Sequence, residues 1–155
     1  MPFLKKIILP FLLCATLFGA QNPPWRMIYD NDTTGILNCI SPYNPVKNRV
    51  LTEEKIRASV REAVVEGVDA QLLQPAHGWV PWWHSKVLPL KEHEQWFQKH
   101  YGAKPNLGEM DFLRKGGDLI GVFIDECKKN NVAALVSYRM NDGHHQEWAF
   151  EKKVG

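Results

Sequence analysis

Cysteine is scarce in this 155-residue chain, which contains three. The three form no CxxC pair and match no zinc-finger spacing, so a structural zinc site built from cysteines is excluded. Cys39 and Cys127 are able to pair if the protein is exported. Cys127 lies on the apolar side of a predicted helix, however, which favours the alternative of a buried free thiol.

A hydrophobic run long enough to span a membrane is also missing. The run over residues 7–20 follows Lys5 and Lys6 and falls short of the roughly 20 apolar residues that a transmembrane helix needs. A basic start followed by a short apolar run that ends in small residues is typical of a signal peptide. We therefore predict a signal peptide over residues 1–20, export to the periplasm or the cell exterior, and no stable membrane span after cleavage. An uncleaved N-terminal anchor is the alternative.

An excess of charge of either sign is absent from the predicted mature chain, residues 21–155. The whole sequence has 19 basic and 17 acidic residues, and cleavage removes two lysines and no acid, which leaves 17 of each. Long-range attraction to nucleic acid requires a basic surface, so no nucleic-acid partner is predicted. The apolar fraction of 45% and the charged fraction of 23% are those of an ordinary globular domain.

The chain does contain an alternation of short apolar strands and amphipathic helices. Strands are predicted over residues 27–29, 68–74 and 132–138, and helices from the cap Thr52 to Gly67, over residues 92–101, and from Asp118 to Lys129. Residues 33–51 are predicted to form a loop rich in turn formers, and residues 76–115 are predicted to form a long insertion. This order predicts an α/β fold with parallel strands and right-handed crossovers.

Polar or ring-bearing residues follow all three predicted strands. Because the carboxyl ends of parallel strands lie together and bind ligands, we predict substrate contacts there. The candidates are Asp30 and Asp32 after the first strand, Gln74 and His77 after the second, and Arg139, Asn141, Asp142 and His144 after the third. Carboxylates and amides bind sugar hydroxyls well. The residues around Asp30 also suit a simple turn, and Arg139 and Asp142 are close enough in sequence to pair with each other.

Three tryptophans stand close together in the predicted insertion, at Trp79, Trp82 and Trp83. An indole ring gives flat, rigid contact area for the apolar face of a sugar and still donates one hydrogen bond. They are therefore candidate substrate-binding residues. The alternative is that some of them pack the insertion onto the sheet.

Three segments of the chain carry a resemblance to a known group of proteins. They are Arg26-Met27-Ile28-Tyr29-Asp30-Asn31-Asp32, Leu72-Leu73-Gln74-Pro75, and Ser137-Tyr138-Arg139-Met140-Asn141-Asp142 followed by His144 and His145. They resemble the first three strands of bacterial glycoside-hydrolase-like barrel proteins, over about residues 25–148. The resemblance implies a partial TIM (β/α)8 barrel. Since a complete barrel needs eight strands and about 250 residues, we expect residues 21–155 to be its truncated N-terminal portion.

The resemblance also implies acid–base hydrolysis of a polysaccharide or glycan by two carboxylates. It places both carboxylates beyond Gly155, so the catalytic pair is unknown and the chain alone is expected to be inactive. Asp142 is the only candidate catalytic residue within the chain. A non-catalytic carbohydrate-binding protein is the first alternative.

A metal-dependent hydrolase is the second alternative, with Asp30, Asp32, Asp142, His144 and His145 as possible ligands. The sequence has no HExxH motif, and adjacent histidines on an extended chain point to opposite sides. We therefore predict neither a metal nor another cofactor.

Overall fold

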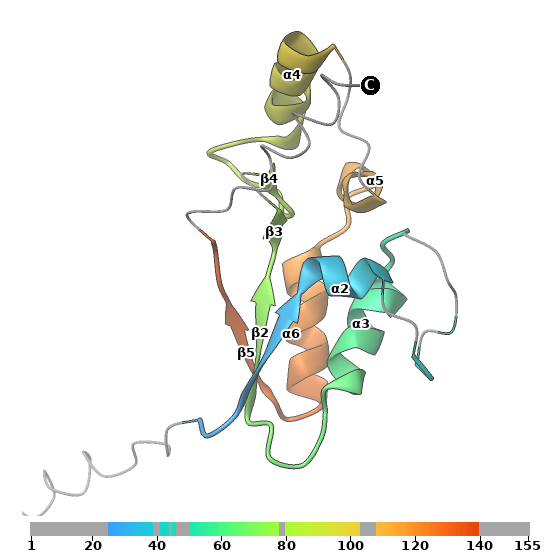
Figure 1. Cartoon of the computed structure of the whole chain (residues 1–155), viewed down its shortest axis with the longest axis vertical. Helices are drawn as coiled ribbons and strands as arrows, with labels where there is room; N and C mark the ends of the chain where they lie inside the picture. The colour runs from blue at the N-terminus through green and yellow to red at the C-terminus, as the bar shows by residue number, and fades with distance from the viewer. Residues whose placement is uncertain are drawn as a thin grey trace, which may run out of the picture.

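A three-stranded parallel sheet forms the centre of the molecule in the computed structural model, which describes residues 25–38, 41–43, 45, 50–77, 80–102 and 108–139 (Figure 1). The strands are β1 (Ile28–Asp32), β2 (Ala70–Gln74) and β5 (Ala133–Val136), in the order β1-β2-β5. The predicted mixed α/β class and the parallel strands are confirmed. The predicted signal peptide lies outside the described residues.

Strand β2 is central and is paired on both sides. Its register runs from Ile28↔Ala70 to Asp32↔Gln74 on one side, and from Ala70↔Ala133 to Leu73↔Val136 on the other. Leu73 of this strand is fully buried on the face that the helices cover. This register places the carboxyl ends of all three strands at one edge of the sheet.

Two predicted helices pack side by side against this sheet (Figure 1). Helix α3 (Glu53–Glu62) begins at Thr52, whose hydroxyl accepts a hydrogen bond from the backbone N–H of Lys55 at 3.2 Å. Helix α6 (Leu119–Lys129) begins at Asp118, whose carboxylate accepts from the N–H of Gly121 at 2.9 Å. Each cap satisfies a backbone donor that the first turn leaves without a partner, so both starts follow from the sequence.

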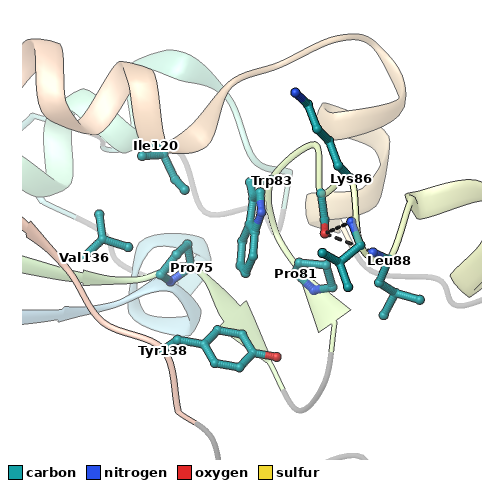
Figure 2. Close-up of a pocket in the computed structure, with 10 residues that line it drawn as sticks. Pro75, Pro81, Trp83, Lys86, Leu88, Ile120, Val136 and Tyr138 are labelled. Carbon is teal, nitrogen blue, oxygen red and sulfur yellow. Dashed lines mark hydrogen bonds between the residues drawn. The ribbon is translucent and has the colours of Figure 1, made fainter.

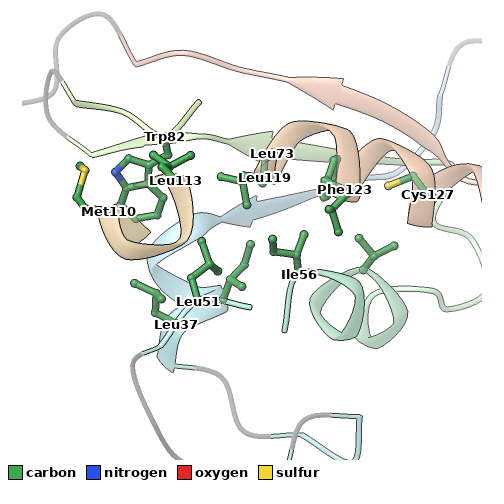
Figure 3. Packing of buried hydrophobic residues seen from close by; sticks show 13 residues of the cluster. Leu37, Leu51, Ile56, Leu73, Trp82, Met110, Leu113, Leu119, Phe123 and Cys127 are labelled. Atoms are coloured by element: carbon green, nitrogen blue, oxygen red, sulfur yellow. The ribbon is translucent and has the colours of Figure 1, made fainter. Parts of the chain in front are cut away.

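The hydrophobic core lies between these helices and the sheet (Figure 3). Ile56 from α3, Leu73 from β2 and Phe123 from α6 meet there with no exposed surface. Cys127 lies in the same cluster and carries a free thiol, which confirms the prediction of a buried free cysteine. Burial, with a smaller effect of Glu126, raises the pKa of this thiol to about 11.

Several elements differ from the sequence-based prediction. Helix α2 (Thr33–Asn38) occupies part of the predicted loop. The predicted insertion contains the short antiparallel pair β3 (Ala76–His77) and β4 (Val80–Pro81), followed by α4 (Leu90–Tyr101) and α5 (Gly108–Arg114). Helix α4 starts two residues before the predicted position and ends at Tyr101 as predicted, with Gly102 in a left-handed conformation directly after it. Across the described residues, no helix is both long and apolar enough to cross a membrane.

Candidate functional site

A chain of hydrogen bonds joins the carboxyl ends of all three sheet strands. Gln74 donates from Nε2 to Asp30 Oδ2 at 2.6 Å, and its Oε1 accepts from Arg139 Nε at 2.5 Å. Arg139 also donates from a terminal nitrogen to Asp32 Oδ2 at 3.0 Å. Four residues predicted from the sequence to contact substrate therefore lie together, and we call them the strand-end network.

The pleat of β1 explains how two acids reach the same place. Side chains along a strand alternate between its faces, so Asp30 and Asp32 share one face. Asn31, between them, points to the opposite face, where it is buried and donates from Nδ2 to Ser59 Oγ of α3 at 3.2 Å. The pairing of β1 with β2 then brings the amide of Gln74 within hydrogen-bonding distance of the Asp30 carboxylate.

The strand-end network is open to solvent. The side chains of Arg139 and Asp32 are 42% and 46% exposed. An ion pair at that exposure contributes only about 0–1 kcal/mol to stability, so the fold depends little on it. The network remains accessible to a ligand, to which it presents carboxylate acceptors, guanidinium donors and an amide that does both.

An apolar groove of about 520 Å³ lies beside the end of β5 (Figure 2). Its described lining consists of Pro75, Pro81, Trp83, Ser85, Lys86, Val87, Leu88, Ile120, Val136 and Tyr138. Trp83 and Tyr138 meet edge to face, with ring centroids 5.8 Å apart and an interplanar angle of 84°. This arrangement is favourable for two aromatic quadrupoles and fixes both rings at the groove.

The neighbouring tryptophans Trp82 and Trp83 lie in different surroundings. Trp82 is 0% exposed and packs in the core with Met110 and Leu113 (Figure 3). Trp83 lines the groove. Of the two roles that the sequence left open for these residues, Trp82 therefore takes the packing role, and Trp83 remains available to a ligand.

The other predicted contacts are less fully placed. His77 lies in β3, three residues beyond Gln74 at the end of β2. Trp79, Asn141, Asp142 and His144 lie outside the described residues. Within the described ranges, no group of three His, Cys, Asp or Glu side chains is arranged to hold a metal ion.

The groove itself was not predicted from the sequence. Tyr138 gave a partial indication, because it ends the third predicted strand with a ring. Val136 and Ile120 gave no indication of a groove, since an apolar side chain on a strand or a helix is expected in the core. They belong to a groove only because they lie beside β5, which is an outer strand of the sheet among the described residues.

Comparison with known proteins adds no assignment. No protein-family model matches the chain, and no curated protein matches its sequence. The functional argument therefore depends on the strand-end network and the groove.

Proposed function

We propose that this chain is part of an exported, glycoside-hydrolase-like (β/α) barrel protein that contacts a glycan at the carboxyl ends of its strands. The observation that carries the proposal is the strand-end network, in which Gln74 and Arg139 connect the ends of three parallel strands. Ligands of α/β proteins bind at this edge of the sheet.

The chemistry of the network suits a sugar better than an ion. Neighbouring sugar hydroxyls both donate and accept hydrogen bonds, and the network offers both kinds of partner within one surface. The acids Asp30 and Asp32 favour donors, whereas Arg139 favours acceptors. A simple anion would meet two carboxylates, and a simple cation would meet a guanidinium, so each is disfavoured by part of the site.

The proposal assigns sugar binding, not bond cleavage, to these residues. Glycoside hydrolysis requires two carboxyl groups flanking the scissile bond, one of them acting as a proton donor. A non-catalytic carbohydrate-binding protein would use the same contacts. Release of reducing sugar from a bound glycan by the full-length protein separates the two, because only the enzyme produces it.

Glycan binding is tested by two matched arginine substitutions. Arg139→Gln removes the guanidinium from the network, while Arg26→Gln removes one that pairs with Asp69 at the opposite end of the sheet. A hydrogen bond to a charged group is worth about 1.5–3 kcal/mol, so we expect Arg139→Gln to weaken binding about tenfold or more.

Binding is measured by calorimetry against a panel of soluble oligosaccharides. Arg26→Gln should retain the wild-type affinity. Equal losses in the two variants, or no binding of any oligosaccharide by the wild type, would contradict the proposal.

A further inference from the structure

The strand-end network carries an unbalanced charge. It contains the carboxylates of Asp30 and Asp32 and the guanidinium of Arg139, whereas Gln74 is neutral. The charge of Asp32 is compensated, because Arg139 donates to its Oδ2 at 3.0 Å. Among the described residues, the carboxylate of Asp30 accepts only from the neutral amide of Gln74 and forms no ion pair with a basic side chain. The remaining negative charge of the network therefore lies at Asp30.

The amide of Gln74 separates this carboxylate from the guanidinium. Its Nε2 donates to Asp30 at 2.6 Å and its Oε1 accepts from Arg139 at 2.5 Å. The reverse orientation of the amide would turn its oxygen toward a carboxylate and its hydrogens toward a guanidinium, so the two neighbours hold it in one orientation. A cationic group that binds Asp30 need not contact Arg139, whose N–H groups remain directed at acceptors such as the hydroxyl oxygens of the same ligand.

The carboxylate of Asp30 is accessible to a ligand. Asp30 is exposed, and it lies on the face of the sheet opposite to α3, because its neighbour Asn31 points to Ser59 of that helix. A carboxylate has roughly four acceptor positions, of which Gln74 occupies one. The others favour a charged donor, because a hydrogen bond between two ions is shorter and stronger than one to a neutral hydroxyl.

We propose that the strand-end network selects glycans by charge and that its ligand is an amino sugar whose protonated amine binds Asp30. This inference rests on the proposed glycan contact and adds the class of sugar. A neutral sugar offers Asp30 only a hydroxyl donor, and an acidic sugar brings a second negative charge toward the unbalanced carboxylate, which repels it. Affinity should therefore fall from amino sugars to neutral sugars and again to acidic sugars.

The experiment compares trisaccharides of glucosamine, glucose and glucuronic acid that share one linkage. Binding to the full chain is measured by calorimetry at about pH 6, where an amine is protonated and a carboxylate is ionised. The proteins are the wild type, Asp30→Asn and Glu66→Gln. Asp30→Asn removes the charge and keeps an oxygen that accepts from Gln74. Glu66 is exposed in the turn between α3 and β2, at the opposite end of the sheet, so Glu66→Gln is a control with the same change in net charge.

The wild type is expected to bind the glucosamine trisaccharide about three- to fivefold more tightly than the glucose trisaccharide, as for an exposed ion pair. Glucuronic acid should bind most weakly. Asp30→Asn should abolish the preference for glucosamine, Glu66→Gln should retain it, and a rise in salt from about 20 mM to about 500 mM should reduce it by screening.

Equal binding of the three trisaccharides, or a preference for glucosamine that survives Asp30→Asn, would overturn the selection by charge and leave the proposed glycan contact standing. No binding of any trisaccharide by the wild type would overturn both.

Discussion

The carboxylate of Glu126 accepts a hydrogen bond from Arg61 Nε at 2.7 Å, across the interface between α6 and α3. A second bond arrives from Arg57 of α3 at 3.0 Å, so one acid of α6 holds two arginines of its neighbour. Burial by itself raises the pKa of Glu126, but the hydrogen bonds from Arg61 and Arg57 outweigh that effect and lower it. Glu126 is therefore ionised in the folded protein at neutral pH and joins the two helices that cover the sheet.

Removal of this carboxylate should destabilise the protein. Glu126→Ala leaves two arginines at a largely buried interface without their main acceptor, although both retain other acidic partners. We expect a loss of about 2–3 kcal/mol in the free energy of unfolding, measured by urea denaturation.

The neighbouring acid provides the control for this substitution. Asp125 also accepts from Arg57, at 2.7 Å, but its side chain is 49% exposed whereas that of Glu126 is 5% exposed. Asp125→Ala should cost about 1 kcal/mol or less. Equal losses for the two variants would show that burial does not set the strength of this interaction.

The sheet and its two covering helices follow from local sequence signals, whereas the surfaces around the site do not. Thr52 and Asp118 were recognisable as caps because a hydroxyl or carboxylate precedes an amphipathic run in each case. Helix α2 was predicted as a loop because Gly35 and nearby turn formers lower helix propensity. Tertiary packing overrides that preference, since Ile36 of α2 is buried in the core.

The candidate site was also predictable from the sequence only in part. The polar residues that follow each predicted strand were enough to predict that polar side chains gather at the strand ends. The partners of Arg139 were not predictable, because Gln74 and Asp32 reach it only through the register of the sheet. The different surroundings of Trp82 and Trp83 were not predictable from the sequence either, because an irregular segment has no periodicity that shows which side chains are buried.

His93 of α4 should make the protein less stable in mildly acidic solution. The ring is buried against Phe97 and lies parallel to Trp96, and its Nε2 has no hydrogen-bond partner among the described residues. Burial lowers its pKa, and the nearby carboxylate of Glu94 offsets only part of that effect. The folded state thus binds a proton less readily than the unfolded state, so stability is lost as the pH falls below about 6.5.

The measurement is the thermal midpoint of unfolding at pH 7.5, 6.5 and 5.5. His93→Phe keeps a ring in place and removes the titration, so its midpoint should fall less across this range than that of the wild type. His100→Phe, at an exposed position on the same helix, should retain the wild-type dependence. A wild-type midpoint that stays constant between pH 7.5 and 5.5 would refute the prediction.

The thiol of Cys127 should report on global unfolding. It is fully buried, and its pKa of about 11 keeps it protonated at neutral pH, whereas the thiolate is the reactive form. In a chain with Cys14→Ser and Cys39→Ser, labelling by a disulfide reagent should be negligible in native buffer. The rate should rise at the urea concentration that unfolds the protein, as followed by circular dichroism. Rapid labelling of the native chain would mean that α6 opens locally.

Substitution of the two adjacent tryptophans should separate a role in folding from a role in ligand binding. Trp82 has no exposed surface and packs among core residues, so Trp82→Ala should cost about 3–5 kcal/mol in unfolding free energy. Trp83 lines an open groove, so Trp83→Ala should cost about 1 kcal/mol and leave the circular dichroism spectrum unchanged. Urea denaturation followed by circular dichroism measures both losses without depending on either indole as a probe.

Trp82→Ala weakens the fold itself, so a loss of glycan binding in that variant is no evidence that Trp82 contacts the ligand. The same loss in a folded Trp83→Ala variant is evidence that Trp83 contacts the ligand. A Trp82→Ala protein as stable as the wild type would contradict the position of this side chain in the core.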